Sequence, residues 1–262
     1  NMTIILSTNT YIKSGLNPIF ELLNNNPELG IELFANNQDD EYTKNLLKIG
    51  KKTDRFLTYH EQIFDVDHSE LSDDESYSLQ QIKIALKHCK ELGIKDIVYH
   101  VNNKTISNKN NMITNASKEL KKITQLADKE NINILVENVG VISKNNMLLN
   151  ESEFIDFCLA HPNPVLIDIG HVNANGWNLK HVIKSLNDKI KFYHLHNNDG
   201  YNDEHLFVHD GTLDIEYFFE LYFKYTPNAK LTLEYNYDIG LNSEGIQRDI
   251  DYVYEKINSN IE

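Results

Sequence analysis

Eight short apolar runs recur along the chain, and each has the length and composition of a buried β-strand. They are rich in Ile, Val, Leu, Phe and Tyr, as is typical of strands in a sheet that helices cover. Each stretch between two runs has room for a helix and two loops. The expected strands are residues 3–7, 31–35, 56–60, 97–101, 134–138, 165–169, 192–196 and 231–235.

A helical repeat of apolar positions is clearest in four of the intervening stretches. These are residues 79–89, which precede Gly93, and residues 116–127, 154–159 and 215–222. Crossovers of this length between strands imply parallel pairing and right-handed units. Eight such units close into a (β/α)8 TIM barrel, which usually needs about 250 residues. We therefore expect an α/β protein with a single TIM-barrel domain, residues 1–262.

An open doubly wound sheet is the alternative architecture for alternating strands and helices. A nucleotide-binding sheet of this kind carries a glycine-rich turn after its first strand. Residues 7–11 instead read Ser-Thr-Asn-Thr-Tyr. The barrel is therefore preferred, and a nicotinamide or flavin cofactor is not expected.

Charge and composition narrow the class of partner. The formal net charge is −14, and the only arginines are Arg55 and Arg248, so a nucleic-acid-binding surface is disfavoured. No apolar stretch approaches the roughly 20 residues that span a bilayer, and the chain opens directly on a strand-like run, so neither a membrane anchor nor a leader is expected. Cys89 and Cys158 lie in separate helical stretches, which fits a reduced, cytoplasmic compartment.

Residues that can hold a metal stand where the expected strands end. Such ends gather at one mouth of a barrel, where active sites are built. Convergent carboxylates repel one another unless a cation compensates, and neither arginine lies near them in sequence. Taken singly, a strand-end histidine is usually just solvated, and a lone glutamate could pair with a lysine or arginine. The candidates are His60, His100, Glu137, Asp168, Glu234, and the pair His194 and His196, which share one strand face.

Four segments of the chain resemble the xylose isomerase-like barrels. They are Ile-Leu-Val-Glu-Asn ending at Asn138, the Asp168-x-x-His171 element, His194-Leu-His196 followed by Asp203-Glu-His205, and Leu-Thr-Leu-Glu ending at Glu234. That superfamily contains sugar and sugar-phosphate isomerases and epimerases, and also the AP endonuclease family 2 enzymes, called endonuclease IV. The resemblance extends over all eight expected strands.

The isomerase and epimerase branch implies one divalent ion, such as Mn²⁺, Mg²⁺, Co²⁺ or Zn²⁺, and a small carbohydrate substrate. By this resemblance Glu137 and Glu234 would also exchange a proton beside a carbonyl while the ion stabilises an enediolate. His171 would touch the substrate, and His196 would lie behind the ion or beside the substrate. Members of the branch commonly form homo-oligomers. The implied metal ligands are Glu137, Asp168, His194 and Glu234.

The endonuclease branch implies three zinc ions and phosphodiester hydrolysis. Its ligand pattern would fall on His60, His100, Glu137, Asp168, His171, His194, Asp203, His205 and Glu234. The acidic charge and the scarcity of arginine favour the isomerase or epimerase interpretation. A non-catalytic barrel that binds a sugar remains a third interpretation.

Four other histidines are expected to play no part in the chemistry. His88 and His181 lie in helical stretches and are expected at the surface. His68 and His161 lie in or beside loops, and the sequence shows no partner for either.

Overall fold

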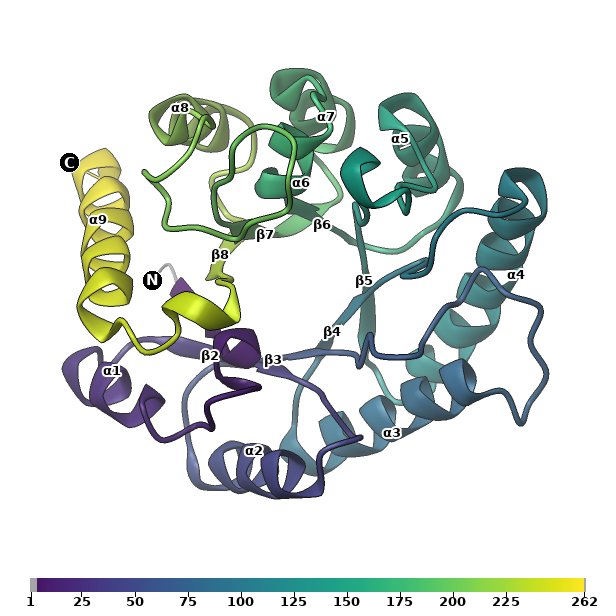
Figure 1. Cartoon of the computed structure of the whole chain (residues 1–262), viewed down its shortest axis with the longest axis horizontal. Helices are drawn as coiled ribbons and strands as arrows, with labels where there is room; N and C mark the ends of the chain where they lie inside the picture. The colour runs from purple at the N-terminus through teal and green to yellow at the C-terminus, as the bar shows by residue number, and fades with distance from the viewer. Residues whose placement is uncertain (1–3, 262) are drawn as a thin grey trace.

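A computed structural model describes residues 4–261, which form a closed barrel of eight parallel strands (Figure 1). Each strand pairs with its neighbours in chain order, and β8 returns to β1 through Ile4–Leu231 and Leu6–Leu233. The predicted TIM barrel is confirmed, although Thr3 lies outside the described residues. The strands are β1 Ile4–Ser7, β2 Gly30–Phe34, β3 Leu57–His60, β4 Asp96–Tyr99, β5 Asn133–Glu137, β6 Val165–Asp168, β7 Ile190–Leu195 and β8 Lys230–Leu233.

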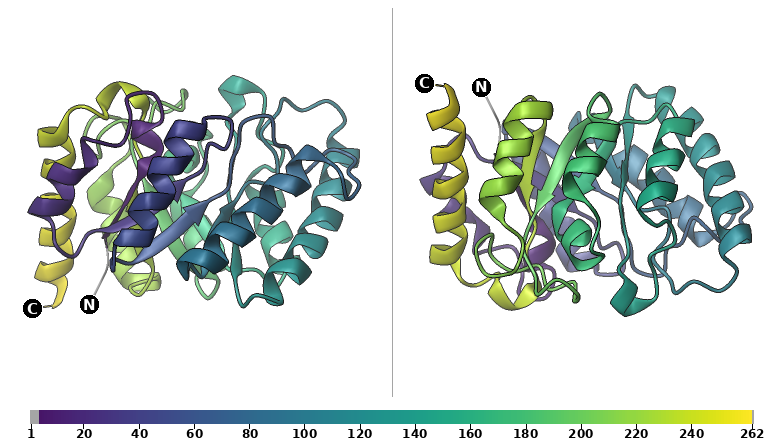
Figure 2. Two further views of the ribbon diagram at one scale, coloured as in Figure 1. Left: turned by 90° about the horizontal axis from the view of Figure 1, so that it is seen from below. Right: turned by 90° about the horizontal axis from the view of Figure 1, so that it is seen from above.

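Helices surround the barrel on its outer side, as the three ribbon views show (Figures 1 and 2). Local sequence sets their ends: Asn150 and Glu153 form a reciprocal capping box at the start of α5, and α3 ends at Gly93 in the left-handed conformation. The helices are α1 Ile19–Asn25, α2 Asp40–Lys52, α3 Tyr77–Leu92, α4 Lys109–Asp128, α5 Glu151–Ala160, α6 Ile169–Ala174, α7 Leu179–Leu186, α8 Ile215–Tyr225 and α9 Ser243–Ile261, with 3-10 turns η1 Thr8–Tyr11, η2 Ile142–Lys144 and η3 Tyr237–Ile239.

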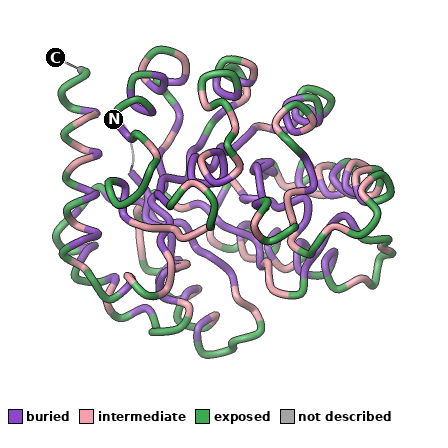
Figure 3. The backbone as a smooth tube through the Cα atoms, turned by 45° about the horizontal axis from the view of Figure 1, so that its top comes forward, coloured by how far each residue is buried: buried purple, intermediate pink, exposed green. Residues whose placement is uncertain are grey.

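Apolar side chains form two regions of core, one between the strands and the helices and one inside the barrel. Figure 3 shows the buried backbone concentrated in the strands and the exposed residues on the outer faces of the helices. The inner region consists of Ile5, Val98, Leu135, Leu166 and Phe192. Because side chains alternate along a strand, the residues two positions further on also point into the barrel, one layer nearer its mouth. They are Ser7, His100, Glu137, Asp168 and His194.

Within the described range, no helix is sufficiently long and apolar to cross a membrane.

Candidate metal centre

The four residues expected to hold one ion converge at the mouth of the barrel. The Nδ1 atom of His194 lies 2.8 Å from Oε1 of Glu137, 3.6 Å from Oδ2 of Asp168 and 3.5 Å from Oε2 of Glu234. All four side chains are buried, and the most accessible, Glu234, is only 5% exposed. Three carboxylates are therefore held around one ring nitrogen in a region of low dielectric constant, where a cation would relieve their mutual repulsion.

Another group of donors lies at the ends of β3 and β4. His60, His100 and Glu137 each place a potential ligand atom within 4.8 Å of the others, and Nε2 of His100 lies 2.9 Å from Oε2 of Glu137. The other oxygen of Glu137 faces His194. Glu137 is therefore shared, with one oxygen directed to each side, which is the arrangement of a carboxylate that bridges two ions.

A third group comes from α6 and the loop after β7. Asp203 lies between two imidazoles, with Oδ2 3.3 Å from Nε2 of His171 and Oδ1 3.0 Å from Nε2 of His205. His205 has a positive φ of 51°, a conformation that costs free energy for a residue with a side chain and marks a constrained position. The sequence placed all three residues near the mouth, and the structure brings them together.

Five imidazoles of these groups share one arrangement. In each ring one nitrogen is hydrogen-bonded to an oxygen acceptor, and the other is directed at the carboxylates of the mouth. Metal-binding histidines are characteristically fixed in this way. The anchoring contacts are His60 Nδ1 to the carbonyl of Glu61 at 2.8 Å, His100 Nδ1 to Oδ1 of Asn103 at 2.8 Å, His171 Nδ1 to the carbonyl of Asn138 at 2.7 Å, His194 Nε2 to Glu32 at 3.1 Å and His205 Nδ1 to the carbonyl of Glu234 at 3.2 Å.

Several inward-facing atoms of the described chain make no aligned hydrogen bond, although all are buried. Buried polar atoms are normally paired, because an unpaired one costs about 1–3 kcal/mol. Here each atom lies within 3.5 Å of a potential ligand atom of another side chain without an aligned hydrogen bond, so the donor set fits divalent metal ions. They are His100 Nε2, Glu137 Oε1, His194 Nδ1, Asp203 Oδ1 and Glu234 Oε2.

The sequence matches the family described as xylose isomerase-like TIM barrel over residues 19–256. The chain belongs to the xylose isomerase-like TIM barrel family. No curated protein matches it. Its fold is similar to those of solved structures with low sequence identity.

Three of these structures illustrate the range of the fold. A D-tagatose 3-epimerase-like protein has a TM-score of 0.77 and 18% identity, with 100% of both chains covered. The IOLI protein with a bound zinc atom has a TM-score of 0.79 and 16% identity, with 98% of this chain and 99% of that chain covered. AP endonuclease, family 2 from Brucella melitensis has a TM-score of 0.71 and 15% identity, with 92% and 97% covered. Solved structures of similar fold thus include proteins described as epimerase-like and as an AP endonuclease.

His196 lies behind the mouth of this xylose isomerase-like barrel rather than in it. Its Nε2 lies 2.8 Å from the carboxylate of Asp168, and its ring stacks on that of His205 with centroids 3.7 Å apart. The close approach depends on Gly170, since a Cβ atom built there would lie 2.1 Å from the His196 ring. From there His196 supports Asp168 and His205, and it places a potential ligand atom within 4.8 Å of those of His171, Asp203 and His205.

Sequence reasoning missed two acidic residues near the centre. Glu32 is 1% exposed in the middle of β2 and contacts His194. A carboxylate inside an otherwise apolar strand was the available signal for it. Glu61 directly follows His60 and pairs with His68 at 2.8 Å, a partner for His68 that the sequence did not show. His161 also has a partner, because its Nε2 lies 3.0 Å from the hydroxyl of Ser117.

The helix histidines expected at the surface divide into two cases. His181 is exposed on α7, as expected, and pairs with Glu151 at 2.9 Å. His88 on α3 is only partly exposed, because its Nδ1 reaches the hydroxyl of Tyr59 at 2.9 Å.

Burial and mutual charge shift the pKa values of the acids at the mouth in opposite directions. For Glu137, burial raises the pKa, but His100 and His194 outweigh it, and the pKa lies below its usual range. For Glu234, burial dominates, and with Glu137 and Glu32 nearby the pKa rises to about 7. The two glutamates expected to work together therefore differ in how readily they hold a proton.

The imidazoles respond to the same two influences. Burial lowers the pKa of His60 well below its usual value and that of His196 to about 4. For His205, burial also lowers the pKa, but Asp203 outweighs it and raises the value to about 9. Because a ligand imidazole must be neutral, an ion binding beside His205 has to displace a proton near neutral pH.

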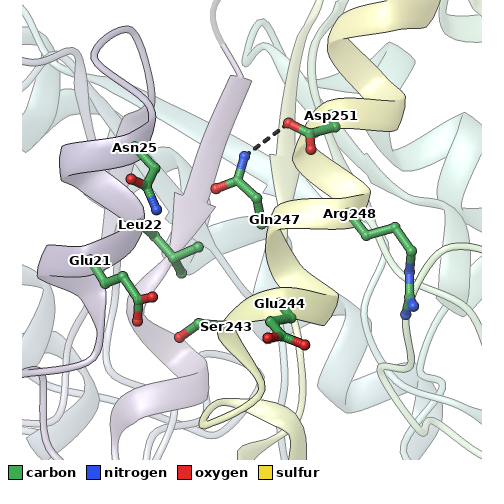
Figure 4. A pocket seen from close by; sticks show the side chains of 8 residues that line it. All are labelled: Glu21, Leu22, Asn25, Ser243, Glu244, Gln247, Arg248 and Asp251. Carbon is green, nitrogen blue, oxygen red and sulfur yellow. Dashed lines mark hydrogen bonds between the residues drawn. The ribbon is translucent and has the colours of Figure 1, made fainter.

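A cavity of about 420 Å³ opens over the donor atoms. Apart from the donors, its wall carries amides and a few apolar groups, and Lys144 of η2 lies 4.0 Å from Asp203. Another hollow lies between α1 and α9, on the outside of the barrel, and is lined by eight side chains such as Glu21 and Gln247 (Figure 4). Its described lining contains no imidazole, unlike that of the cavity at the mouth.

Proposed function

We propose that this chain is a divalent-metal-dependent hydrolase with a multinuclear centre, acting on a phosphate ester of a small hydroxylated substrate. The observation that carries the proposal is the set of five imidazoles, each with one nitrogen anchored and the other facing a carboxylate. One ion held by Glu137, Asp168, His194 and Glu234 would not require that arrangement at His60, His100 and His205.

The ligand groups overlap in a way that suits closely spaced ions. The first group is His60, His100 and Glu137, the second is Glu137 with Asp168, His194 and Glu234, and the third is His171, Asp203 and His205. Zinc is the ion that this mixture of imidazole and carboxylate suits best, and the similar IOLI structure contains zinc. Bound divalent ions would supply positive charge for a phosphoryl group and an acidified water.

The rest of the cavity determines the class of substrate. Asn9, Asn102 and Asn236 line it, and the amide oxygen of Asn102, which has no hydrogen-bond partner among the described residues, would accept a substrate hydroxyl. Among the described residues that line the cavity, Lys144 is the single lysine, and it would pair with an anionic group of the substrate. The volume is that of a site for a small molecule.

A small substrate is favoured over duplex DNA, because both arginines serve the fold. The guanidinium of Arg55 donates to the carbonyls of Leu23, Asn26 and Leu29 at 2.7–3.0 Å. Arg248 lies over the ring of Phe207, 5.6 Å from its centroid. With a net charge of −14, the chain offers little to a phosphate backbone.

The second candidate is the sugar isomerase or epimerase expected from the sequence. Glu137 and Glu234 come from different strands and both face Nδ1 of His194, so they could address two sides of a carbon held beside one ion. Similar folds include a D-tagatose 3-epimerase-like protein and D-psicose 3-epimerase.

Metal analysis and activity of one variant separate the two candidates. Zinc-loaded protein should contain about three ions per chain and hydrolyse p-nitrophenyl phosphate or its diester. His60→Ala should remove one ion and most of the hydrolysis. For an isomerase, one ion should suffice, and the same variant should still exchange the α-proton of a ketose with solvent deuterium. A single ion in the wild-type protein, with no hydrolysis, would overturn the proposal.

A further inference from the structure

Glu61 and His68 form a fully buried acid–base pair directly behind the first ligand group. Oε1 of Glu61 lies 2.8 Å from Nε2 of His68, and both side chains are 0% exposed. The His68 ring also stacks on Tyr99 of β4, with centroids 4.7 Å apart. Burying such a pair is expensive, and apolar residues of similar volume are often at least as stable. The pair therefore calls for a role other than stability.

The backbone carbonyl and the side-chain carboxylate of Glu61 each hold one of the two histidines at the ends of β3 and β4. Its backbone carbonyl accepts the hydrogen bond from Nδ1 of His60 at 2.8 Å. Its Oε2 atom accepts the backbone N–H of His100 at 3.0 Å. His68 holds the other carboxylate oxygen and so prevents the side chain from turning away.

A second set of contacts joins the same two loops. Oδ2 of Asp67 accepts the backbone N–H groups of Asn103 and Lys104 at 3.0 and 2.8 Å. The amide of Asn103 donates to the carbonyl of Val66 at 2.9 Å, which directs its oxygen at Nδ1 of His100. The loop after β3 and the loop after β4 are therefore held as one unit.

We propose that Glu61 and His68 are positioning residues that hold His60 and His100 with Nε2 directed at Glu137. The inference rests on the metal centre of the proposed function and assigns a dedicated support to one ligand group. Small rotations of a ligand ring misdirect its lone pair, and loss of an outer partner typically costs about 10–100-fold in metal affinity. The pair should therefore matter for one ion and little for the others.

The test is zinc binding to the full chain, measured by chelator competition and by metal analysis after equilibration at fixed free zinc. Glu61→Ala should weaken one of the bound ions at least about 10-fold and leave the remaining ions in place. Glu61→Gln should restore much of that affinity, because its amide oxygen can still accept the His100 N–H and its NH₂ group can donate to a neutral His68. Rescue by this variant separates positioning from a simple effect of charge.

Glu119→Gln is the matched control. Glu119 is 6% exposed on α4 and accepts the hydroxyl of Ser72 at 2.7 Å, so it is a buried acid outside the ligand groups. The variant should bind zinc as the wild type does. Equal zinc affinity in Glu61→Ala and wild type would overturn the inference, and so would an equal weakening of every ion.

A second measurement tests the same inference in metal-free protein. The Nδ1–H of His100 should give a protected ¹⁵N-coupled signal, because it is bonded to Asn103. Glu61→Ala should abolish that protection, and Glu61→Gln and Glu119→Gln should retain it. If the wild-type protein bound a single ion, the proposed function would fail, and this signal would still decide the role of Glu61. An unchanged signal in Glu61→Ala would contradict that role.

Discussion

The carboxylate of Glu32 lies 3.1 Å from Nε2 of His194, so the ring has an acid at each end. Glu32 lies in β2. The three acids that face Nδ1 are Glu137 at the end of β5, Asp168 at the end of β6 and Glu234 directly after β8. In the neutral ring, this contact favours the tautomer in which Nε2 carries the proton and Nδ1 presents its lone pair.

Glu32→Gln should weaken metal binding without unfolding the barrel. An amide accepts the same hydrogen bond but no longer makes the ring a stronger base, so we expect about a 10–100-fold loss of affinity at the His194 ion. Chelator competition with zinc measures the loss. Glu28→Gln, at an exposed position before β2, is the control and should bind as wild type. An unchanged zinc affinity in Glu32→Gln would contradict the role assigned to Glu32 in supporting His194.

The stability of metal-free protein should fall as the pH rises from about 7 to 9. The pKa of His205 is raised to about 9 in the fold, above its value in an unfolded chain, because Asp203 stabilises the charged ring. The stability that charged His205 contributes is complete below the pKa of this histidine in the unfolded chain, and it is lost as the pH rises through 9. Zinc-loaded protein should show the opposite trend, because the ion competes with that proton. Urea unfolding at several pH values, with and without zinc, measures the direction in which stability changes with pH in both forms.

Gly170→Ala should damage the centre without adding or removing charge. The new Cβ would lie 2.1–2.8 Å from ring atoms of His196, so that ring must move away from Asp168. We expect a loss of about 1–3 kcal/mol in the free energy of unfolding, as for other overpacked sites, together with weaker zinc binding. Denaturant titration and chelator competition measure the two effects. Wild-type values in both would show that His196 can move freely.

Lys144→Met should raise KM for p-nitrophenyl phosphate and change kcat little. Lys144 lines the cavity from η2 but lies at its rim, where its charge would attract the phosphate equally in the bound substrate and in the transition state. Steady-state kinetics with zinc-loaded protein measures the split. Lys180→Met, at an exposed position on α7, should leave both constants unchanged. A loss in kcat alone would place Lys144 in a different role.

The strand pattern predicted the barrel and most of the centre, because both follow from local order. Glu137 and Asp168 end apolar runs, and period-two alternation with Leu135 and Leu166 directs them into the barrel. Parallel closure then brings all strand ends to one mouth, whatever the loops do. The alternation along each strand and the parallel closure of the barrel are enough to bring the main donors together.

The supporting residues could not be predicted in the same way. Glu32 meets His194 across the barrel, although 162 positions separate them in the chain. His68 reaches Glu61 only because the loop between them turns back, with Asp65 at a positive φ of 60°. Neither contact follows from a repeat or a strand end, since each depends on the three-dimensional path of the backbone.

The shared position of Glu137 links the loading of neighbouring ions. His100 and His194 hold the two oxygens of this carboxylate, and an ion bound on one side would fix its rotamer further for an ion on the other side. Such coupling is reciprocal, so each ion should raise the affinity of the other by the same factor. A variant that weakens one of these two ions should therefore weaken the other to a smaller extent, through the orientation of Glu137 alone.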